Sequence, residues 1–123
     1  MSKIERFEDI KACQQARSLV KEVYQATGEG KFAKDFSLKD QIRRAAVSVI
    51  SNIAEGFSRQ TDKEFVQFLH IAKGSTSEVQ SQLYLGLDLD YINKEEFERL
   101  YDEADQVTRL ISGFIKYLKG IGS

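Results

Sequence analysis

The chain has 123 residues, 41% of them hydrophobic and 30% charged, and its formal net charge at pH 7 is −1. This length fits one globular domain, so we expect residues 1–123 to form a single domain. No segment approaches the ~18 apolar residues that a membrane span needs, and the N-terminus lacks the apolar core of a signal peptide. One cysteine cannot form an internal disulfide, which predicts a cytoplasmic location. The nearly neutral charge gives no general attraction to nucleic acid.

The sequence contains no proline, which favours long helices. Apolar residues recur at three- and four-residue steps in four segments, as on one buried face of a helix. These segments cover residues 7–27, 38–57, 62–89 and 94–119. Short connections between four amphipathic helices predict an all-α protein, an antiparallel up-down-up-down four-helix bundle.

Local signals predict where these helices begin and end. Gly28 is expected to end the first helix, because glycine commonly follows a helix C-terminus. Residues 28–36 are expected to be irregular, with Phe32 and Phe36 packed beneath the end of the bundle. Ser37 is the predicted N-cap of the second helix. The third and fourth helices are expected to begin at capping boxes, Thr61 with Glu64 and Asn93 with Glu96.

The two central helices carry more apolar surface than one core requires. The apolar arc of residues 38–57 is wider than that of an ordinary surface helix, and residues 62–89 carry a second apolar line beside their main stripe. A monomeric bundle has no evident use for this second line, so we predict a contact between subunits. The residues expected at this oligomer interface are Val47, Ile50, Ile71, Leu85 and Leu89.

The residue patterns of the common catalytic and metal sites are missing from the sequence. A di-iron bundle needs paired Glu-x-x-His motifs, but the only histidine, His70, follows Gln67 by three residues. His70 is expected to face solvent. Cys13 lies on an apolar stripe and is expected to be a small buried side chain rather than a nucleophile. No phosphate-binding glycine loop is present. We therefore expect no catalytic residue, no metal and no cofactor.

A group of polar residues on the second helix has two interpretations. Asn52 and Glu55 share a face with Arg44, while Arg43 lies at the edge of the apolar arc, where a charge needs a partner. Glu78, on the third helix, is a candidate partner within or between subunits. The first interpretation is a structural polar network of Asn52, Glu55 and Glu78. The second is binding of nucleic-acid phosphates by Arg43, Arg44 and Arg59.

Several short motifs resemble those of a known family. They are Gln41-Ile42-Arg43-Arg44-Ala45, Ser51-Asn52-Ile53-Ala54-Glu55-Gly56, Phe68-Leu69, Ala72, Gly74-Ser75 with Glu78, Phe7-Glu8-Asp9-Ile10 and Leu89-Asp90-Tyr91-Ile92. With these motifs, nearly the whole chain resembles the four-helix bundle proteins encoded in intervening sequences of bacterial 23S ribosomal RNA genes.

This resemblance implies a cytoplasmic four-helix bundle that assembles as a homopentameric ring, and it implies no enzymatic activity. It also implies kinship with the accessory proteins of diversity-generating retroelements, which bind nucleic acid and contact a reverse transcriptase. The chain departs from the family pattern at Cys13, where tryptophan is common, and at Ile50, where proline is common. It is also less basic than the retroelement proteins.

Three functional hypotheses follow. The leading one is a non-enzymatic homo-oligomeric bundle that acts as a binding or scaffolding component, with itself and a further protein as partners. The alternative is an accessory protein that binds RNA or DNA through an arginine-lined face or pore. The third is an enzyme that uses Glu55 and Glu78 as paired carboxylates.

Overall fold

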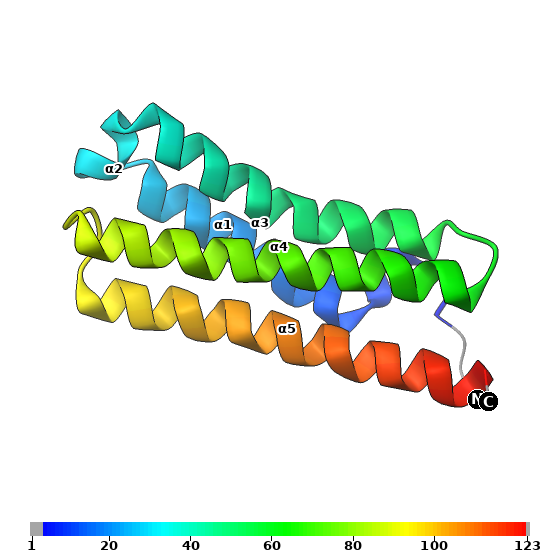
Figure 1. Cartoon of the computed structure of the whole chain (residues 1–123). Coiled ribbons are helices and arrows are strands. Elements are labelled where there is room, and N and C mark those ends of the chain that lie inside the picture. The colour runs from blue at the N-terminus through cyan, green and yellow to red at the C-terminus, as the bar shows by residue number, and fades with distance from the viewer. Residues whose placement is uncertain (1–3, 123) are drawn as a thin grey trace.

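The computed structural model describes residues 4–122 and confirms the prediction of an all-α protein. Four long helices lie side by side in a bundle, and the short helix α2 lies at one end of it (Figure 1). No strand occurs among the described residues. The elements are η1 (Phe7–Asp9), α1 (Lys11–Thr27), α2 (Gly30–Lys34), α3 (Phe36–Phe57), α4 (Asp62–Asp88) and α5 (Lys94–Gly122).

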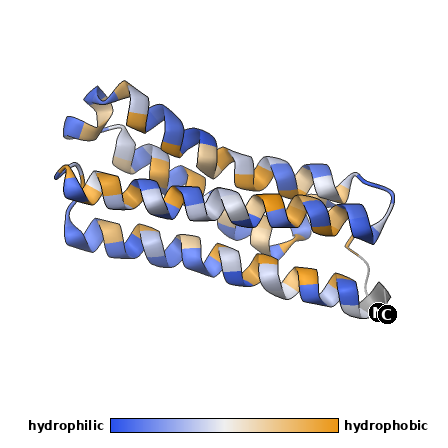
Figure 2. Ribbon diagram, viewed as in Figure 1, coloured by the Kyte–Doolittle hydropathy of each residue, from blue (hydrophilic) through white to orange (hydrophobic). Residues whose placement is uncertain are grey.

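The core lies between the four long helices, each of which contributes one apolar stripe. Helix α3 packs against α1 and α4, and α5 packs against the same two helices. Apolar residues recur along every long helix between hydrophilic ones, as the amphipathic pattern predicted (Figure 2). Cys13 is fully buried in this core. Among the described residues, no helix is both long enough and apolar enough to cross a membrane.

The segment between α1 and α3 differs from its prediction. Residues 30–34 form the helix α2 rather than an irregular loop, and Gly30 has a φ of +59°, which glycine adopts without strain. Phe32 is fully buried, as predicted, and its ring lies 5.2 Å from that of Tyr91. Phe36 was predicted to be covered, but it is 73% exposed, because Phe32 alone packs beneath the bundle end.

The predicted cap of the second helix is also wrong. Helix α3 begins at Phe36, and its N-cap is Asp35, whose Oδ1 accepts a hydrogen bond from the Leu38 N–H at 3.1 Å. Ser37 therefore lies inside the first turn. Asp35 and Ser37 are both good capping residues, and the burial of Phe32 determines where the new helix starts.

The other two predicted caps are present. Asn93 Oδ1 accepts from the Glu96 N–H at 2.8 Å, and Glu96 Oε1 accepts from the Asn93 N–H at 3.3 Å, a complete capping box. Thr61 Oγ1 accepts from the Glu64 N–H at 3.2 Å. The Glu64 carboxylate accepts from the Thr61 hydroxyl rather than from its backbone, so this second box is incomplete.

Candidate functional site

Arg43 joins the start of α3 to the end of α1. Its Nε donates to Thr27 Oγ1 at 2.8 Å and its Nη2 donates to the Tyr24 carbonyl oxygen at 3.2 Å. The guanidinium also lies 4.2 Å from the centre of the Tyr24 ring. The C-terminal carbonyls of a helix carry partial negative charge, so they stabilise a cation as a carboxylate would. The predicted partner Glu78 is therefore wrong for contacts within the chain.

Arg44 and Arg59 make exposed ion pairs with acids one turn earlier on α3. Arg44 Nε lies 2.8 Å from Asp40 Oδ2, and Arg59 Nη2 lies 3.0 Å from Glu55 Oε2. Such pairs contribute little to stability, so phosphates could replace the carboxylates. Arg59 lies just past the C-cap of α3, and at about 1.5 Å per residue the end of α3 is already roughly 20 Å from Arg44. One chain therefore does not bring the three arginines into a single site.

The polar contact between α3 and α4 includes Asn52 of the predicted network but neither of its two glutamates. Asn52 Nδ2 donates to the carbonyl oxygen and the hydroxyl of Ser48 at 2.8 and 3.0 Å. Ser75 Oγ, from α4, donates to Ser48 Oγ at 3.0 Å. Asn52 belongs to this contact, whereas Glu55 pairs with Arg59 and Glu78 is exposed. The sequence signal for this contact was a serine, Ser75, among the apolar residues of the α4 stripe.

The outward face of α4 carries most of the predicted interface. Ile71, Leu85 and Leu89 are 52%, 49% and 50% exposed, and we call these three residues the α4 ridge. Val47, on α3, is 39% exposed. Ile50 is half-buried and packs against the core of its own chain, so it is less available to a partner.

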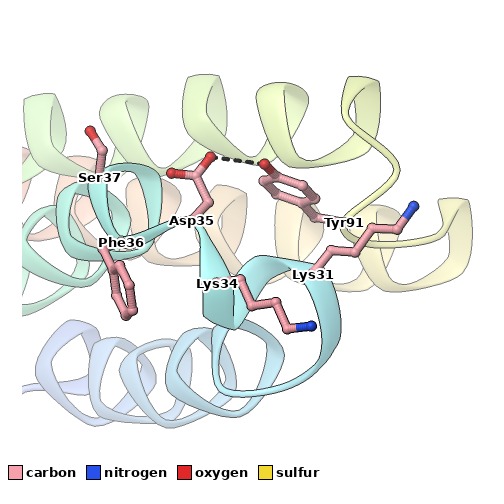
Figure 3. A pocket seen from close by; sticks show the side chains of 6 residues that line it. All are labelled: Lys31, Lys34, Asp35, Phe36, Ser37 and Tyr91. Atoms are coloured by element: carbon pink, nitrogen blue, oxygen red, sulfur yellow. Dashed lines mark hydrogen bonds between the residues drawn. The ribbon is translucent and has the colours of Figure 1, made fainter.

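A hollow that sequence reasoning missed lies where α2 meets α3. It measures about 660 Å³, and its lining includes Lys31, Lys34, Phe36 and Tyr91. Figure 3 shows the two lysines on α2 and the Asp35 carboxylate turned toward the Tyr91 hydroxyl. The exposed Phe36 lies between basic residues at positions 34 and 39. This alternation of an aromatic residue with basic ones was the feature of the sequence that could have indicated the hollow.

Asp35 and Tyr91 influence each other's protonation in this hollow. The Tyr91 hydroxyl donates to Asp35 Oδ2 at 2.9 Å. The pKa of the Asp35 carboxyl lies below its usual value, chiefly because the carboxylate accepts the Leu38 N–H and next because it accepts the Tyr91 hydroxyl. The same bond to Asp35 raises the pKa of Tyr91. The carboxylate is therefore held as the charged acceptor between two donors.

Comparisons with known proteins agree with the motifs noted in the sequence. Residues 8–113 match the family of 23S rRNA-intervening sequence proteins. The chain belongs to this family. A solved structure, a protein with unknown function from the S23 ribosomal protein family of Bacteroides thetaiotaomicron, is similar with a TM-score of 0.78 and 23% identity. The alignment covers 85% of this chain and 98% of that one, a likeness that shows the fold alone. No curated protein sequence matches the chain.

The residues considered for chemistry do not meet in this 23S rRNA-intervening sequence protein. Glu55 and Glu78 are too far apart to act as a pair. Gly56, next to Glu55, packs against Phe65 and Phe68 on α4. Glu78 lies ten residues beyond Phe68 on the same helix, roughly 15 Å away. His70 is exposed, and burial raises the pKa of the Cys13 thiol. The described residues contain no group of three His, Cys, Asp or Glu side chains that could hold a metal ion.

Proposed function

We propose that this member of the family is a non-enzymatic, self-assembling protein that acts as a binding or scaffolding component. Its subunits meet on the outward face of α4. The observation that supports this most is the α4 ridge, three aliphatic side chains on α4 and at its C-cap that are each about half exposed. Burying them against another copy removes apolar surface from water, which favours association.

The glycine at the centre of this face supports a close contact between backbones. Gly74 lies between Ile71 and Glu78 on a 27-residue helix, where glycine is less favourable than alanine by about 0.5–1 kcal/mol. A Cβ atom at Gly74 would meet nothing within 4 Å in the chain. The open space at Gly74 leaves room for a neighbouring subunit to pack closely on α4.

The proposal includes the order of the helices and the size of the assembly. The four long helices run as an antiparallel up-down-up-down bundle, supported by short connections and by the bond between Ser48 and Ser75 across α3 and α4. The assembly is a homopentamer in the cytoplasm, as the family resemblance implied. Five copies of 14.0 kDa give a particle of about 70 kDa.

Sedimentation velocity tests the proposal. Because dissociation follows mass action, the purified protein should sediment as a multimer at micromolar concentration and should shift toward monomer on dilution. Its melting temperature should rise with protein concentration for the same reason. A protein that stays monomeric and melts at one temperature across the whole concentration range would rule out self-assembly.

A further inference from the structure

Three adjoining shallow hollows form one open groove along α2 and the first half of α3. The hollow of about 660 Å³ at α2 shares Phe36 and Ser37 with a second one of about 500 Å³. The second shares Asp40 and Arg43 with a third one of about 540 Å³, which reaches Ser51. We call this continuous surface the α2–α3 groove. It lies beside α1 and α3 and includes no residue of the α4 ridge, although Val47 of the predicted interface lines its third hollow.

The α2–α3 groove is positively charged, although the chain as a whole is not. Five basic residues line it against two acids, Asp35 and Asp40, so its net charge is +3 while that of the chain is −1. The rest of the chain therefore carries −4. The basic residues are Lys31, Lys34, Lys39, Arg43 and Arg44. This separation of charge favours an anion in the groove over one elsewhere on the surface.

Two exposed aromatic rings lie among these cations, besides the half-buried Tyr91. Phe36 is 73% exposed, the most exposed of the large apolar side chains described, and the Tyr24 side chain is 42% exposed. A cation already lies against each ring, with Lys39 Nζ 4.7 Å from the centre of Phe36 and the Arg43 guanidinium 4.2 Å from that of Tyr24. Exposed rings that alternate with cations are typical of surfaces that bind single-stranded nucleic acid, because bases stack on the rings.

We propose that the α2–α3 groove binds a short single-stranded nucleic acid. Phe36 and Tyr24 stack against bases. Lys31 and Lys34, which make no ion pair among the described residues, contact phosphates, and so does Arg44 when a phosphate replaces Asp40. From Phe36 to Ser51 the groove follows about 22 Å of helix, enough for a few nucleotides. Arg59 lies outside it.

The nature of the groove favours a single strand over two other anions. The bases of a duplex are stacked on one another, so they cannot lie on Phe36. An acidic peptide would use the lysines but would gain nothing from two flat aromatic faces. The proposal does not depend on self-assembly, because the groove is formed within one chain.

Fluorescence anisotropy with a labelled oligoadenylate RNA of about 12 nucleotides tests it. Phe36→Leu keeps an apolar side chain but loses the ring, and it should weaken binding about fivefold to a hundredfold, whereas Phe36→Trp should bind at least as well as the natural protein. Because Phe36 is exposed, circular dichroism should show both variants folded. Sedimentation of the same samples reports any change of assembly separately.

Salt dependence tests the lysines. Changing both Lys31 and Lys34 to Gln should reduce the slope of log affinity against log salt by about 1.4, from about 0.7 for each phosphate contact of a single strand. Lys116→Gln, on the exposed side of α5, removes one charge outside the groove and should leave that slope unchanged. Equal affinities of Phe36→Leu and the natural protein would overturn the proposal. Equal binding of a duplex, or displacement of the RNA by polyglutamate at the same charge concentration, would also overturn it.

Discussion

The outward faces of α4 and α5 differ, although both helices bury an apolar stripe in the same core. On α4, the three residues of the ridge are each about half exposed. On α5, whose side chains are described as far as Gly120, the one large apolar side chain with comparable exposure is Tyr117. Most of the other outward positions on α5 are polar or charged, among them Glu98, Asp102, Gln106 and Arg109. Helix α4 also carries polar residues on its outer side, but it exposes more large apolar surface than α5 does.

This contrast shows that the exposed apolar residues of α4 are not needed for the core of the bundle. Both helices meet the needs of the core with one stripe, so the additional apolar residues of α4 contribute little to the fold of a single chain. Exposed aliphatic side chains on one helix reduce solubility unless something covers them. The contrast therefore points to association through α4 and predicts that equal changes on α4 and α5 have unequal effects.

The largest difference is expected for a new charge on each outward face. Leu85→Glu places a carboxylate on the α4 ridge, and burying it unpaired between subunits should weaken association about thirtyfold or more. The stability of the separated chain should change by less than about 0.5 kcal/mol, because Leu85 is half exposed. Sedimentation velocity over a concentration series measures the first effect and denaturation of the dilute protein the second.

Gln106→Glu is the matched control on α5, since it adds the same charge at an exposed position. It should leave both association and stability as they are. If the two variants weakened association equally, the effect would come from net charge and the contrast between α4 and α5 would lose its meaning.

Two adjacent arginines on α3 should differ in how much their polar contacts contribute to the stability of the folded chain. Arg43→Gln removes charged hydrogen bonds to Thr27 and Tyr24, and it should lower the free energy of unfolding by about 1.5–3 kcal/mol. Arg44→Gln removes only an exposed pair with Asp40 and should lower it by less than about 0.5 kcal/mol. Urea denaturation measures both. Equal losses would mean that Arg43 does not anchor the end of α1.

Arg43 also shows how far the sequence could predict this site. Its place at the edge of an apolar arc correctly indicated that its charge needs a partner. The pattern predicts a carboxylate as this partner, because side-chain patterns do not show backbone carbonyls. The end of α1 comes within reach of Arg43 only after α1 and α3 pack together. The exposure of Ile71, Leu85 and Leu89, in contrast, follows from helical periodicity alone, and it was predicted.

The helix caps also include some that the sequence could predict and one that it could not. Thr61 and Asn93 could be recognised because a capping residue and the glutamate three residues later are local to one turn. At the start of α3, Asp35 and Ser37 were equally good candidates by local pattern. The choice depends on Phe32, which packs where Gly86 leaves room, 3.0 Å from the position that a Cβ of Gly86 would take. That packing involves residues more than fifty positions apart, which no local pattern contains.

A smaller difference is expected between two exposed glycines, one on each helix. A Cβ at Gly74 on α4 or at Gly113 on α5 would meet nothing within 4 Å. In dilute, dissociated protein, Gly74→Ala and Gly113→Ala should each raise the free energy of unfolding by about 0.5–1 kcal/mol, because alanine favours helix. At high concentration, Gly74→Ala should weaken association and Gly113→Ala should not. Parallel behaviour of the two variants at both concentrations would contradict a close contact at Gly74.

The smallest expected effect concerns the starts of the helices, where α5 has the neutral cap Asn93 and α3 has the titratable cap Asp35. The pKa of Asp35 is lowered in the folded chain, so its contribution to stability is present above about pH 4 and is lost as the pH falls through the lowered pKa. The pKa of Tyr91 is raised, so its contribution is present below about pH 10 and is lost as the pH rises through the raised pKa. The bond between Tyr91 and Asp35 is the main cause of the change at Tyr91 and the second cause of the change at Asp35, after the Leu38 N–H.

Urea midpoints measured across pH separate the two groups. Tyr91→Phe should remove the alkaline loss of stability and reduce the acidic one, because the Leu38 N–H still favours the Asp35 carboxylate. Asp35→Asn should remove the acidic loss and reduce the alkaline one, because burial also raises the pKa of Tyr91. Tyr101→Phe is the control, since Tyr101 packs against Phe97 on α5 and makes no contact with Asp35, and it should leave both losses in place. If Tyr91→Phe kept the full alkaline loss, that loss would not come from Tyr91. The bond between Tyr91 and the cap of α3, Asp35, would then contribute nothing measurable to stability.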